Sequence, residues 1–71
     1  MPQIHVTLPQ NGWSKEEKAV IVEKLTQAMA DAGMETGVAE RSGVEDMTPF
    51  INVFIRETSE GGYAIGGKVF G

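Results

Sequence analysis

The chain has 71 residues, no cysteine, one histidine and a formal net charge of −4 at pH 7. This length suits a single domain, which we take to span residues 1–71, and the lack of cysteine excludes disulfides and thiolate metal ligands. The six basic side chains are scattered along an acidic chain and no apolar run approaches the roughly 20 residues of a membrane span, so we expect neither nucleic-acid nor membrane binding.

The short length has two further consequences. A chain of about this size buries only about 60% of its unfolded surface and is marginally stable alone. With no disulfide and no predicted metal site, self-association is the expected source of extra stability. The first residues are neither basic nor apolar enough for a signal peptide, so a cytoplasmic location is the expectation.

The stretch Met1–Leu8 predicts a strand, because Ile4, Val6 and Leu8 alternate with polar residues at a period of two. Removal of Met1, which a small second residue permits, would make the nitrogen of Pro2 a free secondary amine. A terminal amine titrates near ~8, and burial or nearby cations would lower its pKa toward that of a general base working near neutrality. The alternative is that Pro2 is only an edge residue that needs no backbone donor.

A long helix is predicted to follow the turn at residues 9–12. Ser14 with Glu17 three residues later fits a capping box, and we expect the helix to run from about Lys15 to Ala32. Gly33 is its predicted C-cap, because glycine adopts the left-handed conformation without strain. Apolar residues spaced by three and four predict one buried stripe: Ile21, Val22, Leu25, Ala28, Met29 and Ala32.

The segment Met34–Thr48 has the least readable pattern. It is long for a connection in so small a domain, and it carries two glycines among several charged residues. A short helical turn around Val38–Arg41 is one expectation. Whether the segment is an ordinary solvated loop or a mobile lid stays open from the sequence.

The most strand-like run follows Pro49 and covers residues 50–56. Large apolar groups point to both of its faces, which predicts a central strand. Asn52 is unusual in a strand, and either a backbone-bonded amide at an interface or a contact to substrate would explain it. Near the end, Gly66-Gly67 separates Tyr63-Ala64-Ile65 from Lys68-Val69-Phe70 and permits either a hairpin or the close approach of another backbone.

The order of elements predicts the fold class. A helix of this length between two strands makes a right-handed crossover, so the two long strands should pair in parallel. We therefore expect an α+β chain: one βαβ unit with a parallel two-stranded core sheet and a short C-terminal hairpin. The sheet face away from the helix is left bare, and we expect oligomerisation to cover it.

Two regions resemble the 4-oxalocrotonate tautomerase family of the tautomerase superfamily. The first comprises Met1-Pro2 with its strand, Gly12 and residues 14–26, and the second comprises residues 51–57 followed by residues 61–67, which read GGYAIGG. Only residues 34–50 are unlike the family, because a longer connection replaces the usual short one. The resemblance implies the tautomerase fold, with homo-oligomers that are dimers or trimers of dimers.

The same resemblance implies an activity. Pro2 would be the catalytic general base of a cofactor-independent tautomerase that acts on small enol or 2-keto acids. It would take the proton from the enol hydroxyl and return it to carbon, with no metal and no organic cofactor. Two alternatives stay open: a catalytically silent oligomeric protein of the same fold, and a hydratase or dehalogenase of unsaturated acids that uses protonated Pro2.

The chain departs from the family at the substrate-binding residues. The family holds a diacid with two arginines, and their aligned positions here are Asn52 and Trp13 or its neighbours, none of which is arginine. The aromatic wall of the family site aligns with Tyr63. Arg56, which shares a strand face with Asn52 at ~13 Å, and Arg41 in the long connection are the candidate replacement cations. An uncharged asparagine predicts that monoacids are handled at least as well as diacids.

Overall fold

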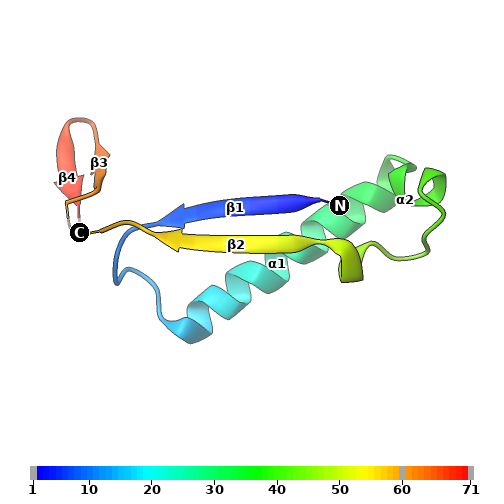
Figure 1. Ribbon diagram of the computed structural model, residues 1–71, viewed down its shortest axis with the longest axis horizontal. Helices are drawn as coiled ribbons and strands as arrows, with labels where there is room; N and C mark the ends of the chain where they lie inside the picture. Colours follow the sequence, from blue (N-terminus) through cyan, green and yellow to red (C-terminus); the bar gives the residue numbers. More distant parts are fainter. Residues whose placement is uncertain (1, 60, 71) are drawn as a thin grey trace.

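The computed structural model describes residues 2–59 and 61–70, with the side chains of Tyr63 and Phe70 outside that description. Figure 1 shows helix α1 running obliquely along a two-stranded sheet, with a hairpin standing beyond one end of the sheet. The chain is therefore a small α+β unit. Its elements in order are β1 (Gln3–Leu8), α1 (Lys15–Glu35), α2 (Val38–Arg41), the 3-10 turn η1 (Thr48–Phe50), β2 (Asn52–Glu57), β3 (Tyr63–Ile65) and β4 (Lys68–Phe70).

Strands β1 and β2 pair in parallel, with Gln3 opposite Asn52 and Leu8 opposite Glu57. This confirms the predicted parallel pairing across a helical crossover. The two strands alternate in exposure, and their half-buried side chains are Ile4, Val6, Leu8, Val53 and Ile55. Within the described residues β2 pairs with β1 alone. A central position for β2 thus stays a prediction about an assembly.

The second strand begins at Asn52, later than the expected residue 50. Thr48–Phe50 forms a 3-10 turn with proline in its first positions. The Asp46 carboxylate accepts hydrogen bonds from the backbone N–H of Thr48 at 3.0 Å and from its hydroxyl at 2.8 Å. These bonds lower the pKa of Asp46, with the backbone bond as the larger cause. Asp46 thereby fixes the turn that delays the strand.

The capping box at the start of α1 is confirmed. The backbone N–H of Glu17 donates to the Ser14 hydroxyl at 3.1 Å, and the N–H of Ser14 donates to the Glu17 carboxylate at 2.7 Å. The predicted end of the helix is wrong, because α1 continues through Gly33 to Glu35 and Thr36 is the C-cap. Gly33 is instead buried inside the helix, where a Cβ atom would collide with the sulfur of Met47.

The buried face of α1 differs from the predicted stripe. Ile21, Leu25 and Met29 are half-buried, as expected of stripe members, but Val22, Ala28 and Ala32 are exposed and the deepest position is Ala30. The reason is geometric. A sheet of two strands covers only a narrow band of the helix, and the segment after α1 packs against the last turns of the helix from another side.

Residues 34–48 form a packed segment. The predicted helical turn is present as α2, and Gly37 enters it with a φ of 81°, which glycine adopts without strain. Ala39 is 1% exposed and Met47 is 8% exposed, so two of the most buried apolar side chains of the described chain come from this connection. The segment is more than a solvated loop and forms part of the core.

The C-terminal hairpin is confirmed. Strands β3 and β4 are antiparallel, with Ile65 opposite Lys68 across a two-residue turn. Gly66 and Gly67 have φ values of 59° and 82°, the left-handed region that such tight hairpin turns require.

One chain buries little of its apolar surface. Its radius of gyration is 15.4 Å, against about 11 Å for a compact chain of this length. Its accessible surface is 5350 Å², against about 4,300 Å² for a compact chain of this mass. These values agree with the expected bare sheet face, while the oligomer itself stays a prediction. No helix among residues 2–59 and 61–70 combines the length and apolar character needed to cross a membrane.

Candidate functional site

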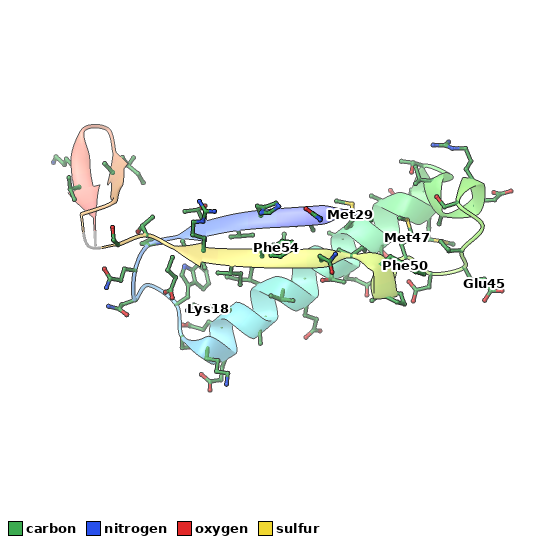
Figure 2. All side chains as sticks on the ribbon, viewed as in Figure 1. Lys18, Met29, Glu45, Met47, Phe50 and Phe54 are labelled. Carbon is green, nitrogen blue, oxygen red and sulfur yellow. The ribbon has the colours of Figure 1, made fainter. Side chains whose placement is uncertain are left out.

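Pro2 lies where the two strands of the sheet begin. Its carbonyl accepts a hydrogen bond from the backbone N–H of Asn52 at 3.0 Å, and the residue is half-buried. Figure 2 shows Met29, Met47 and Phe50 at the same end of the molecule, around the start of β1. Pro2 therefore has a fixed place directly before β1, next to a packed part of the chain.

Two cavities lie beside Pro2. The first has a volume of about 150 Å³ and is bounded on one side by the last turns of α1. The second has a volume of about 190 Å³ and is bounded by residues between α2 and β2. Pro2 and Met47 line both cavities. The remaining lining residues are Met29, Ala32, Gly33, Thr36 and Val38 in the first and Ser42, Val44 and Phe50 in the second.

The walls of both cavities are mainly apolar. Thr36 and Ser42 are their polar members, and the Thr36 hydroxyl already donates to the carbonyl of Ala32 at 2.7 Å. None of the lining residues carries a charge. Such a space suits an apolar group of a ligand. A second carboxylate would lose its hydration there without gaining a cation.

The predicted substrate-binding residues divide into two groups. Asn52 lies beside Pro2, and Arg41 belongs to α2, directly before the lining residue Ser42. Arg56 pairs with Thr7, near the other end of the sheet and ~13 Å along the strand from Asn52. Trp13 and Tyr63 also belong to that distant end, since they follow the last residues of β1 and β2. Of these residues, a single chain joins only Asn52 to Pro2, through its backbone N–H.

Trp13 lines a separate apolar groove. The groove has a volume of about 400 Å³, and its other lining residues are Glu17, Val20, Ile21, Lys24 and Leu25. At the same end of the sheet, the ammonium of Lys18 lies 2.8 Å from the carboxylate of Glu57. The hydrogen bond from Lys18 is the main cause that lowers the pKa of Glu57. This ion pair ties the start of α1 to the end of β2.

A hollow larger than the two at Pro2 lies along the middle of the sheet and does not include Pro2. It has a volume of about 560 Å³ and is lined by His5, Val6, Thr7, Phe54, Ile55 and Arg56. The rings of His5 and Phe54 stack there, with centroids 4.9 Å apart and planes 12° apart. Because its side chains come from two neighbouring strands alone, this hollow has no walls that could enclose a substrate. We interpret it as open sheet surface.

Sequence reasoning missed the residues of the 34–50 segment that line the Pro2 cavities. The apolar members of this segment that do so are Val38, Val44, Met47 and Phe50. Their presence in a connection rich in glycine and charge is the signal that could have indicated a buried wall. Gly33 gave no such signal, because a glycine near a helix end fits a C-cap equally well.

Some expectations lie beyond what can be described. Met1 and the side chain of Tyr63 lie outside the described residues, so the removal of Met1 and the aromatic wall stay predictions.

In the described part of the chain no three side chains of the types His, Cys, Asp or Glu gather into a possible metal site. No family model, curated protein or solved structure matches this chain.

Proposed function

We propose that the protein is a cofactor-independent tautomerase of small enol or 2-keto acids, with Pro2 as its general base after removal of Met1. One observation carries the proposal: Pro2 is held at the start of a core strand by the N–H of Asn52 and lines two apolar cavities. A base needs a defined position, and an amine among apolar groups loses some of its preference for the protonated state.

The chemistry requires one amine and a conjugated substrate. The Pro2 nitrogen accepts the proton of the enol hydroxyl, and the electron pair of that O–H bond forms the carbonyl. The displaced double-bond electrons reach the substrate carbon, which takes the proton back from the Pro2 ammonium. The same group is thus base and then acid, and the reaction is balanced without a cofactor.

Binding the substrate carboxylate is the task of polar residues outside the cavity walls. The side-chain amide of Asn52 can donate two hydrogen bonds beside Pro2. Arg41 is the last residue of α2, directly before Ser42, which lines the second cavity. Arg56, Trp13 and Tyr63 would reach Pro2 only from a second copy of the chain, because their own Pro2 is at the opposite end of the sheet.

This division supports the finer fold proposal, a tautomerase fold completed as a dimer or a trimer of dimers. Two sheets placed antiparallel would bring the Arg56 end of one copy to the Pro2 end of the other. The open face with Phe54, which is 49% exposed, gives such an assembly an apolar surface to cover.

The experiment compares the protein, shown by mass spectrometry to begin at Pro2, with its Pro2→Ala variant on a panel of enol acids. We expect kcat/KM to fall at least a hundredfold, because general base catalysis contributes about 10²–10⁴-fold. Pro9→Ala, in a turn, is the matched control. Near-normal activity of Pro2→Ala would refute the proposal, and inactivity of the native protein toward every acid would favour a silent binding protein.

The pH dependence separates the remaining alternative. If Pro2 is a base, kcat/KM rises with pH until its amine is fully deprotonated. A hydratase or dehalogenase that uses the protonated amine loses activity over the same range. A falling profile that disappears in Pro2→Ala would therefore replace tautomerisation by acid-assisted addition of water.

A further inference from the structure

We infer that Met47 is the specificity-determining residue of the site at Pro2, and that it sets the size of the apolar substituent that a substrate carries. The inference rests on the proposed function and names its substrate class: monoacids with an aryl or branched apolar group. It is drawn from residues 34–50, the part of the chain where the resemblance to the tautomerase family ends.

Met47 belongs to the walls of both Pro2 cavities. It is one of two residues that line both, and it is 8% exposed, so its side chain lies inside the wall. The other shared residue is Pro2 itself. Any change in the position of the Met47 side chain therefore changes the space available next to the reacting amine.

Gly33 determines where Met47 lies. It is buried in the middle of the last turns of α1, and a Cβ atom placed on it would collide with the Met47 sulfur and lie 3.4 Å from its Cγ. A glycine within a helix is unfavourable compared with alanine. The Met47 thioether packs against the helix backbone at Gly33, and this contact explains why the helix has a glycine at that position.

The size and polarity of the cavities define the occupant. An enclosed apolar cavity of about 150 Å³ accepts benzene, and the smaller Pro2 cavity, which is open to the surface of a single chain, has a similar volume. No charged side chain lines either cavity, so a carboxylate would be unpaired there while a phenyl or branched alkyl group would not. The carboxylate of the substrate must then point out of the cavities, toward the solvent.

Methionine suits a cavity wall that must change shape when a substrate substituent enters. Its side chain is unbranched and has three rotatable bonds, so it can fill a gap or move aside when a larger group enters. A branched or aromatic residue at this position would fix the size of the chamber more strictly. We expect the native protein to accept a phenyl substituent and to exclude a naphthyl one.

The test measures kcat/KM for the enols of pyruvate, phenylpyruvate and naphthylpyruvate. In the native protein the phenyl compound should exceed the other two at least tenfold, the scale on which burial of such a group acts. Met47→Ala joins the chambers and should raise the naphthyl-to-phenyl ratio at least tenfold. Gly33→Ala displaces the thioether into the cavities and should lower the phenyl-to-methyl ratio at least tenfold. Met34→Ala, exposed on α1, should change neither ratio.

A second measurement does not depend on turnover. In protein labelled with ¹³C at the methionine methyl groups, titration with phenylacetate should shift the Met47 resonance, while acetate should not. Met47→Leu preserves the volume of the core and serves where Met47→Ala does not fold. It should keep phenylacetate binding within threefold and exclude naphthylacetate more strictly.

The outcomes distinguish the two proposals. Activity that depends on Pro2 but shows unchanged substituent ratios in both Met47 and Gly33 variants would overturn the inference and leave the proposed function intact. Activity that does not depend on Pro2, together with a normal phenylacetate shift at Met47, would overturn the proposed function alone. An unshifted Met47 resonance at saturating phenylacetate would show that the chambers do not bind an apolar group, and the inference would fail.

Discussion

Phe54→Ala should weaken self-association strongly. Phe54 lies in the middle of β2 on the open sheet face, stacked on His5 and 49% exposed in a single chain. An aromatic side chain presents about 200 Å², so about 100 Å² of Phe54 is available for burial by a second copy. At about 25 cal/mol/Å² this corresponds to roughly 2.5 kcal/mol per copy.

In a symmetric dimer both copies of Phe54 are covered, so the variant should lose up to about 5 kcal/mol. That is more than a thousandfold in the dissociation constant. The surface that one chain has in excess of a compact protein of its mass is about 1,000 Å². One partner of a standard interface buries about 800 Å², so the excess is large enough for one such interface.

Sedimentation equilibrium from nanomolar to micromolar concentration measures the effect. We expect the native protein to remain assembled at micromolar concentration and Phe54→Ala to dissociate or unfold there. Met34→Ala removes a side chain from α1 that is 61% exposed, more than Phe54, and is the control. A stable, folded native species of 7.7 kDa at micromolar concentration would refute the reasoning, as would equal dissociation constants for Phe54→Ala and the native protein.

Three further predictions concern single residues. Asn52→Arg should raise kcat/KM for a diacid relative to a monoacid about fivefold, because a charge-assisted bond exceeds a neutral one by roughly 1 kcal/mol; a native tenfold preference for the diacid would instead indicate that another arginine fills the gap. The lowered pKa of Glu57 means that the folded protein gains stability from it above about pH 4.5 and loses that gain as the pH falls through the lowered value. Glu57→Gln should therefore flatten the acid side of a Tm-against-pH curve, and an unchanged slope would contradict the role of its bond to Lys18. The hydroxyl of Thr58 is buried without a partner in the described part of the chain, so Thr58→Val should leave the Tm unchanged or higher, whereas a loss of about 1 kcal/mol would reveal a water or a second copy bound to that hydroxyl.

Local signals in the sequence determined what could be predicted of the fold. The capping box at Ser14 depends on residues three positions apart, and the hairpin depends on two adjacent glycines, so both were readable. Parallel pairing of β1 with β2 followed from the length of the helix between them. The end of α1 was not readable, because Gly33 is used for contact with Met47, which is distant in sequence.

The candidate site was only partly predictable for the same reason. Pro2 could be proposed from its amine before a predicted strand and Asn52 from the family resemblance, and the Asn52 N–H does bond to the Pro2 carbonyl. The cavity walls come from a connection whose packing depends on tertiary contacts. Arg56 and Trp13 could be named but not placed: in one chain, strand register puts Arg56 far from Pro2, and Trp13 follows the distant end of β1.

The pairing of Gln3 with Asn52 sets an order of events during synthesis. A ribosome adds about 5–20 residues per second, so β1 waits on the order of several seconds for its partner strand. A helix of this length forms within about a microsecond once its residues have emerged. We therefore expect the nascent α1 to shelter Ile4, Val6 and Leu8 first, and the sheet to close last. Slow codons between α1 and β2 would then prolong the interval in which β1 exposes an unpaired edge, and the yield of folded protein should depend on them.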